Sequence, residues 1–568
     1  MRHLFQKMQH AFGLMLMIGV AVAALAGTAY AQEDAPVTLR LAMPAPQNLD
    51  PVQLSRFDAH MHDLAENLFV GLTRFNPNTR EIDPVLAESW TVSDDGLRWT
   101  ITLREDIQWV RYDPDQGEIV AVRPVVAGDF VYAIQRACDP LRPSPVTPNL
   151  MIIRGCLTVA NAFPEVINDL FIAREIGARA TGPHTLEIDL LFPSTYFPSL
   201  LSTPELRPVP REAASISNNW AARLSTIMTT GPYAITSWTA SGMQLVRNPY
   251  WPDDFEGNID RVEVTFAENG ADVMAAVARD RADMARLNPE DAAAAHAAYP
   301  DLFHSAQGNS ITVIGFSYDR ALVNTVEIRR ALALALDKAA LINQFLPDQA
   351  LPADHFTPSW VVAAPSIEGA MTDPAQARAG YEAAGFPNCA GVPETLILLI
   401  PQDDPLWEQM GPAIIDQWAA ALNCHPGLFE IRSVPRTLLI ALSHSAYDPE
   451  RVTRSHMWVA TWNADYLDAS AWINDALHCR YGYLKPTREC EPADSLLDRA
   501  GIANNLDERA ELYAQAEEQF FGPQGTFPVI PLFFSTTSWL QQPRLSGVNA
   551  NSPARFDLWT LADENPAG

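Results

Sequence analysis

The chain has 568 residues, of which 48% are hydrophobic and 9% aromatic. It is too long for one compact core and too apolar to remain disordered. With 39 Lys and Arg against 68 Asp and Glu, its formal net charge of −29 repels a phosphate backbone, so nucleic-acid binding is not expected.

Residues 1–31 follow the three-part pattern of an export signal. Basic residues precede an apolar run from Ala11 to Ala26, and small residues lead to a cleavage point after Ala31. The run is shorter than the about 20 apolar residues that span a bilayer, although an uncleaved anchor stays open. Gln32 stands where a lipoprotein needs cysteine. We therefore expect a periplasmic or extracellular protein, exported by a cleaved signal and not lipid-anchored.

Strands and helices alternate along the rest of the chain. Short β-branched or alternating runs predict strands at Thr38 to Ala42, Trp99 to Leu103, Thr185 to Leu190 and Val262 to Phe266. The 3.6-residue apolar spacing predicts helices at Ala59 to Leu72, Ala127 to Cys138, Val326 to Phe345, Pro374 to Ala384 and Leu506 to Phe521. No repeat or low-complexity tract interrupts this mixture, which predicts α/β lobes.

The six cysteines indicate disulfides, because their number is even and the chain carries an export signal. Six cysteines allow fifteen connectivities. Proximity in the sequence favours three pairs: Cys138 with Cys156, Cys389 with Cys424, and Cys479 with Cys490. The close C-x-x-C spacing of a metal site is missing.

Several motifs recur in the order and spacing of a known family. They are Asn48 to Pro51, Glu66 to Leu72, Pro84 to Trp90, Trp99 to Arg104, Ala127 to Tyr132, Thr230 to Tyr233, Arg247 to Trp251, Ile328 to Lys338, Trp462 to Tyr466 and Pro528 to Phe534. Together they resemble the bacterial extracellular solute-binding proteins of family 5, receptors that feed peptides and related solutes to ABC importers.

The resemblance implies an α/β, two-lobed type II periplasmic-binding-protein fold that closes around a ligand. It further implies an extra subdomain in lobe one. The expected boundaries are a signal peptide at 1–31, a lobe one core at 32–60, 176–270 and 525–568, the extra subdomain at 61–175, and lobe two at 271–524.

The resemblance also implies where a ligand binds. In oligopeptide- and dipeptide-binding members, the aspartate of a W-x-x-D pattern takes the α-ammonium of the ligand, and Asp465 follows Trp462 at that spacing. We expect Asp465, Trp462 and Tyr466 at the ligand. Asp468 is a competitor for the role of Asp465.

The partner of a ligand carboxylate stays open. Some peptide receptors carry an arginine six residues before the aspartate, where this chain has Val459. Arg454 and His456 are nearby alternatives, although each is also an ordinary loop residue.

Two further segments are expected at the ligand. Leu54, Ser55 and Arg56 lie where family members approach the ligand with an extended strand, which would hold its main chain by backbone pairing. Phe534 lies where the C-terminal part of the pattern returns to the cleft, although it could equally belong to the core.

No metal, cofactor or catalytic role is expected. Asp58, His60 and His62 suggest metal ligands, but positions 60 and 62 lie about 200° apart on a helix. The sequence contains no G-x-S-x-G, H-E-x-x-H or P-loop motif.

We therefore expect a non-enzymatic, monomeric receptor that captures short peptides between two closing lobes and delivers them to the permease subunits of an ABC importer. A same-fold receptor for an oligosaccharide, an opine-like compound or a chelated metal is the alternative. An exported hydrolase and a chaperone or signalling protein also stay open.

Overall fold

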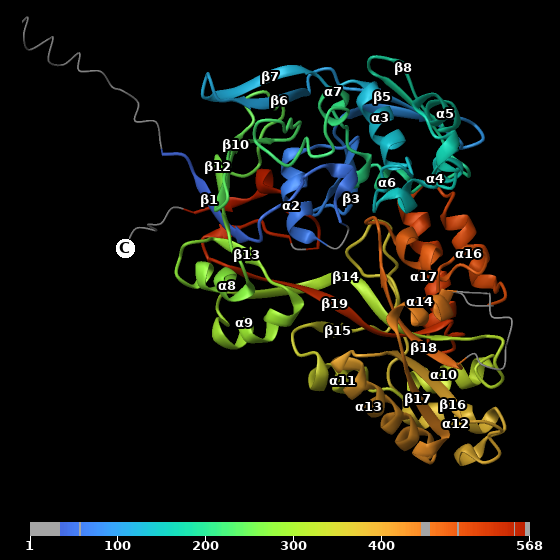
Figure 1. Cartoon of the computed structure of the whole chain (residues 1–568). Helices are drawn as coiled ribbons and strands as arrows, with labels where there is room; N and C mark the ends of the chain where they lie inside the picture. The colour runs from blue at the N-terminus through green and yellow to red at the C-terminus, as the bar shows by residue number, and fades with distance from the viewer. Residues whose placement is uncertain (1–34, 56–57, 445–454, 485–487, 550, 563–568) are drawn as a thin grey trace, which may run out of the picture. The chain divides into compact units, whose positions relative to one another are not determined.

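A computed structural model of the chain describes residues 35–55, 58–444, 455–484, 488–549 and 551–562 (Figure 1). The predicted signal segment, Arg56 and Arg454 lie outside these ranges. No helix within them is long and apolar enough to cross a membrane.

An eleven-stranded sheet dominates the fold. Its strands are β1 (Thr38–Met43), β10 (Tyr233–Trp238), β11 (Gly242–Arg247), β12 (Arg261–Phe266), β13 (Met284–Arg286), β14 (Phe303–Phe316), β15 (Ala350–Pro352), β16 (Leu396–Pro401), β17 (Phe429–Val434), β18 (Met457–Asn463) and β19 (Val529–Gln541). The order is β10-β11-β12-β1-β13-β19-β14-β18-β16-β17, and β15 pairs with β19. β1 runs parallel to β12 and β13, and β16 runs parallel to β17 and β18. This mixture of parallel and antiparallel pairing is typical of α/β proteins.

The two longest strands, β14 and β19, pair antiparallel at the centre of this sheet. Their register shifts between the pair Gln307–Thr536 and the pair Ile311–Phe534, so that three residues of β14 lie opposite Ser535 alone. Extra residues of this kind bend a strand and interrupt its ladder. The first of them is Gly308, where an added Cβ would lie 2.6 Å from the Ser535 hydroxyl. The close approach of the two strands therefore requires glycine there.

The remaining strands form smaller sheets. β4 (Ala87–Val92), β5 (Arg98–Leu103), β9 (Thr185–Asp189) and β8 (Ala178–Gly182) make a four-stranded sheet in that order. The two-stranded sheets are β2 (Thr73–Asn76) with β3 (Glu81–Pro84), β6 (Gln108–Asp113) with β7 (Glu118–Pro124), and β20 (Leu545–Ser546) with β21 (Thr560–Leu561).

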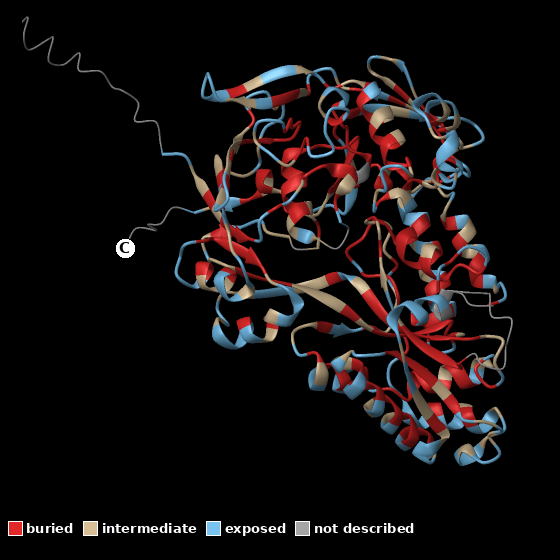
Figure 2. Cartoon of the chain, in the orientation of Figure 1, coloured by how far each residue is buried: buried red, intermediate tan, exposed pale blue. Residues whose placement is uncertain are grey.

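Helices pack against these sheets. They are α2 (Ala59–Leu68), α3 (Ala127–Ala137), α4 (Cys156–Ala160), α5 (Asp169–Glu175), α6 (Phe197–Leu200), α7 (Arg211–Ala214), α8 (Gly270–Ala278), α9 (Ala292–Ala298), α10 (Val326–Leu334), α11 (Lys338–Phe345), α12 (Pro374–Ala383), α13 (Pro405–Leu422), α14 (Arg436–His444), α15 (Asp475–Leu477), α16 (Pro492–Ala500) and α17 (Leu506–Phe521). α13 packs on β16 and β17, and α8 packs on β1 and β13 (Figure 1). Most residues of α2 are buried, whereas α11, α12 and α13 leave one side exposed (Figure 2).

The predicted strands are confirmed to within one residue at each end, but two predicted helices differ. The predicted helix from Val326 to Phe345 is two helices. Asp337 ends the first run with a non-helical ψ of 87° and caps the second, because its carboxylate accepts the amide of Ala340 at 2.9 Å.

The predicted helix from Ala59 to Leu72 ends early, at Leu68. Phe69 is extended, and the Leu68 carbonyl accepts the amides of Thr230 and Gly231 at 3.0 and 2.9 Å. A side chain at Gly231 would clash, since its Cβ would lie 2.4 Å from the Asn67 carbonyl. The motif Glu66 to Leu72 thus meets the motif Thr230 to Tyr233 at the end of this helix, although more than 150 residues separate them in the sequence.

Three disulfides fasten local loops. They join Cys138 with Cys156, Cys389 with Cys424, and Cys479 with Cys490, the three pairs expected from the sequence. Each closes a segment of between 11 and 35 residues, which restricts the unfolded chain.

Candidate functional site

A cavity of about 430 Å³ lies where five parts of the chain converge. The irregular stretch of β14 with the facing part of β19 forms one part of its lining, and the turn after β18 forms another. Helix α2, the segment 202–204 and the C-terminal segment 551–555 form the others, and single residues such as Leu54, Asn149 and Arg286 add to the lining. The titratable lining residues include His62, Asp63, Glu66, Arg286, Asp465 and Arg555. Side chains with neutral amides and hydroxyls are more numerous, among them Asn149, Asn309, Asn463 and Ser535.

Three of the predicted ligand residues line this cavity: Asp465, Tyr466 and Leu54. Asp465 stands in the turn that follows β18, and its side chain is half-buried. Leu54 is buried directly after a short helical turn. Ser55 is exposed outside the lining, and its carbonyl accepts a bond from His62 Nε2 at 3.1 Å.

Trp462 and Phe534, also predicted at the ligand, are not among the residues that line the cavity. The Trp462 indole nitrogen donates to the carbonyl of Ala471 at 2.9 Å and so holds the ends of the turn that carries Asp465. Phe534 is 3% exposed, and its ring packs against Trp472 and His355.

Asp468, the predicted competitor of Asp465, is fully buried in an ion pair. It accepts from Arg509 Nη2 at 2.6 Å and from the Ser199 hydroxyl at 3.0 Å. His456, a predicted carboxylate partner, is equally enclosed. Its Nδ1 accepts the amide of Ile397 at 3.1 Å. These side chains have structural partners and lie outside the cavity lining.

A buried tyrosine connects the lining to a second carboxylate. The Tyr466 hydroxyl donates to Asp475 Oδ2 at 3.0 Å and lies 3.2 Å from the Ser470 hydroxyl, from which it can accept. The Tyr466 ring stacks on Tyr196 with centroids 5.4 Å apart. Burial raises the pKa of Asp475 to about 7, in spite of the Tyr466 hydrogen bond, and the charge of Asp465 adds to the rise.

The raised pKa of Asp475 predicts a pH dependence of stability. Between its ordinary pKa of 3.8 and about 7, the folded protein binds more protons than the unfolded chain, so stability falls as pH rises through this window. Asp475→Asn keeps an acceptor for Tyr466 and removes the titration. We expect the variant to gain up to about 2 kcal/mol relative to the wild type between pH 5 and pH 8. Denaturant unfolding at several pH values measures this, and parallel curves for the two proteins would contradict it.

Acidic and basic residues that the sequence analysis did not assign to the ligand site line the cavity: Asp63, Glu66, Arg286 and Arg555. Glu66 binds both Arg74 and Arg207, and Asp63 binds Arg286 Nη2 at 3.0 Å. Glu66 belongs to a recognised motif, but no spacing in the sequence connects it with Arg555, which lies almost 500 residues later. The fold alone brings these groups together.

The possible metal ligands of α2 have other roles. Asp58 caps the helix by accepting the amide of Met61 at 3.2 Å, and His62 donates to Ser55. Burial lowers the pKa of His60 and of His62, so both rings are neutral at pH 7.

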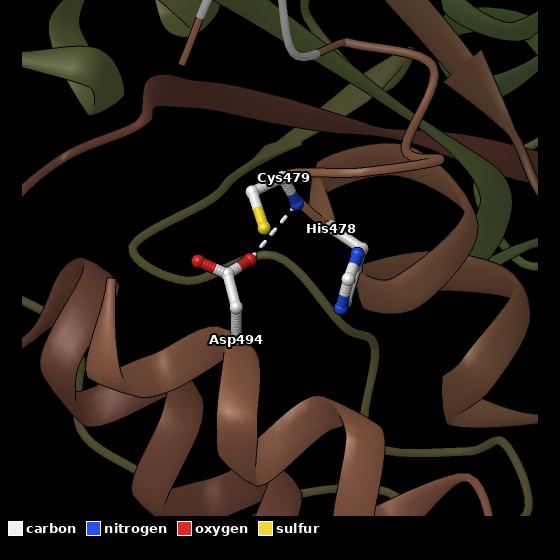
Figure 3. A group of neighbouring side chains, drawn as sticks. All are labelled: His478, Cys479 and Asp494. Atoms are coloured by element: carbon white, nitrogen blue, oxygen red, sulfur yellow. Dashed lines mark hydrogen bonds between the residues drawn. The ribbon is translucent and has the colours of Figure 1, made fainter. Parts of the chain in front are cut away.

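His478, Cys479 and Asp494 also lie close together (Figure 3). The Cys479 sulfur belongs to a disulfide, and Asp494 accepts the Cys479 amide at 2.9 Å and Arg488 Nη1 at 2.8 Å. His478 Nε2 lies 3.0 Å from Asp498. All three side chains therefore already have partners within the protein, in a disulfide or in hydrogen bonds.

Comparison with solved structures establishes the class of the fold. The structure is similar to the unliganded open form of MppA, a periplasmic murein tripeptide binding protein, with a TM-score of 0.76 and 20% sequence identity over 93% of this chain and 98% of that one. The fold is therefore the two-lobed type II fold of periplasmic binding proteins.

Sequence comparison identifies the family. The middle region of the bacterial extracellular solute-binding proteins, family 5, matches residues 81–483. The chain belongs to this family. It is 26% identical to the periplasmic oligopeptide-binding protein OppA of Salmonella typhimurium, over 95% of this chain and 96% of that protein. It is 24% identical to a probable deoxycholate-binding periplasmic protein of Escherichia coli, over 90% of this chain and 90% of that protein.

Proposed function

We propose that the protein is the substrate-binding receptor of an ABC importer, which captures short peptides in this cavity and delivers them to the permease. The single observation that carries the proposal is the position of Asp465 in the lining of the cavity in a family 5 chain. A carboxylate in an enclosed site forms a charge-assisted bond with an ammonium group. Relatives named as oligopeptide-binding and dipeptide-binding proteins support the peptide as ligand.

The proposal includes the organisation expected from the sequence. Residues 1–31 act as a cleaved export signal, and the mature protein works as a periplasmic monomer without catalytic activity. Lobe one comprises 32–60, 176–270 and 525–568 with the extra subdomain 61–175, and lobe two comprises 271–524. The names of the periplasmic relatives support the compartment.

Calorimetric titration of the mature protein with tripeptides tests the proposal. Free tripeptides are expected to bind, and the same peptides acetylated at the amino group are expected to bind at least about 100-fold more weakly, since Asp465 then has no ammonium to pair with. Equal affinity for free and acetylated peptides would refute the role of Asp465.

A non-peptide solute is the second candidate, because relatives of similar identity are named for deoxycholate and for haem. Native mass spectrometry of freshly purified protein distinguishes the two. A co-purified mass that fragments into amino acids supports the peptide, and any other mass supports the second candidate.

A further inference from the structure

The carboxyl of Asp475 is a titratable group close behind the lining of the cavity. Asp475 is not among the lining residues, but its Oδ2 accepts the hydroxyl of Tyr466, which lines the cavity, at 3.0 Å. Tyr466 directly follows Asp465, the second acidic group of this part of the lining. A single tyrosine side chain thus connects the Asp475 carboxyl to the turn that carries Asp465.

The charged groups around Asp475 oppose its ionisation. Two carboxylates of the turn after β18 act on it, and Asp465 acts more strongly than Asp468. The charge of Asp468 is balanced by Arg509 of α17, whose Nη2 lies 2.6 Å from it. No basic side chain in the described part of the chain is among the groups that act on Asp475. Burial and like charge together raise the pKa of Asp475 to about 7.

The other titratable groups around Asp475 are phenols from three further elements. Tyr196, at the start of α6, stacks on the ring of Tyr466, and Tyr481 follows α15. Burial and the charge of Asp475 raise the pKa of both phenols. Tyr513 of α17 acts on both of them, and burial raises its pKa to about 12. All three are neutral at pH 7, so they neither balance a charge on Asp475 nor titrate with it.

A cation that binds Asp465 cancels the larger of the two like charges that act on Asp475. Under the proposed function, on which this inference rests, that cation is the ammonium group of the ligand. Ionisation of Asp475 then becomes more favourable, because an opposite charge nearby favours the charged form of a carboxyl. We infer that Asp475 is a proton site linked to the ligand site, so that capture of a cationic ligand releases a proton from Asp475 to solvent. By reciprocity, protonation of Asp475 weakens capture.

Calorimetric titration of a free tripeptide in two buffers of different ionisation enthalpy counts the protons exchanged on binding. For the wild type at pH 7 we expect a release of about 0.3 to 0.5 proton per peptide, because Asp475 is about half protonated there before the peptide binds. The number of protons released is also the slope of the logarithm of affinity against pH, so the affinity should rise about 2-fold or more from pH 6 to pH 7.

Two variants assign the proton. Asp475→Asn keeps an acceptor for Tyr466 but cannot titrate, and we expect it to bind the peptide without net release. Asp301→Asn removes a carboxylate from an exposed residue outside the cavity lining and should release as many protons as the wild type. Any proton that the amine of the peptide exchanges is common to the three proteins and cancels in the comparison.

Each result decides. If the wild type takes up protons or exchanges none at pH 7, or if Asp475→Asn releases as many as the wild type, the inference is wrong. The wild-type measurement holds even if the variant does not fold. If the peptide does not bind the wild type, the inference and the proposed function fail together. Binding without proton release refutes the inference alone and leaves the proposed function standing.

Discussion

Asp465→Asn is expected to weaken the binding of a free tripeptide by more than about 100-fold, because loss of one partner from an enclosed ion pair costs about 3–5 kcal/mol. Asparagine keeps the shape of the side chain and removes its charge. The ligand's ammonium would then enter a cavity without its counter-charge. Calorimetric titration at low ionic strength measures the change.

The matched control is Asp301→Asn, which removes the same charge from an exposed residue outside the cavity lining. It should leave the affinity within about 2-fold. The Asp465→Asn variant should also lose the discrimination between free and acetylated peptides. A variant that still prefers the free amine would show that another group holds the ammonium.

Arg509→Met is expected to lower the free energy of unfolding by about 3–5 kcal/mol. Its guanidinium is the cation that pairs with Asp468, and both side chains are almost completely buried. Methionine fills a similar volume but leaves the carboxylate uncompensated. Because Asp468 also accepts from Ser199, the loss extends to a contact between distant segments. Denaturant unfolding followed by tryptophan fluorescence measures the difference.

Two comparisons identify the cause of this loss. Arg432→Met breaks an exposed pair and should cost at most about 1 kcal/mol. The double variant Asp468→Asn, Arg509→Met removes both charges and should recover most of the lost stability. If the single variant loses less than the exposed control, the pair does not stabilise the fold.

Local patterns in the sequence were sufficient to predict most of the helices and strands named in the sequence analysis. β-branched runs indicated β1, β5, β9 and β12, and Asp465 followed from a motif that the cavity lining contains. The break before α11 was missed because the apolar spacing continues through Asp337. The spacing does not reveal that the Asp337 carboxylate caps the start of a second helix. A motif also does not say which way a side chain points. Trp462 belongs to the same motif as Asp465 but turns to Ala471.

The ion pairs that join Arg74 to Glu66 and to Asp557 could not be predicted from the sequence. Arg74 and Asp557 are separated by 483 residues, and no periodicity or spacing relates positions so far apart. Only the completed fold brings α2, the segment before Arg207 and the C-terminal segment to one cavity.

The three residues of β14 that face Ser535 alone have a consequence for how this receptor can change during evolution. Successive side chains of a strand point to opposite faces, so a deletion of one residue in this stretch would turn every following side chain of β14 to the other face. Replacements of lining residues such as Asn309 and Ser310 leave the backbone path unchanged. Homologous receptors with new ligand preferences are therefore expected to differ here in residue type and to keep the same number of residues.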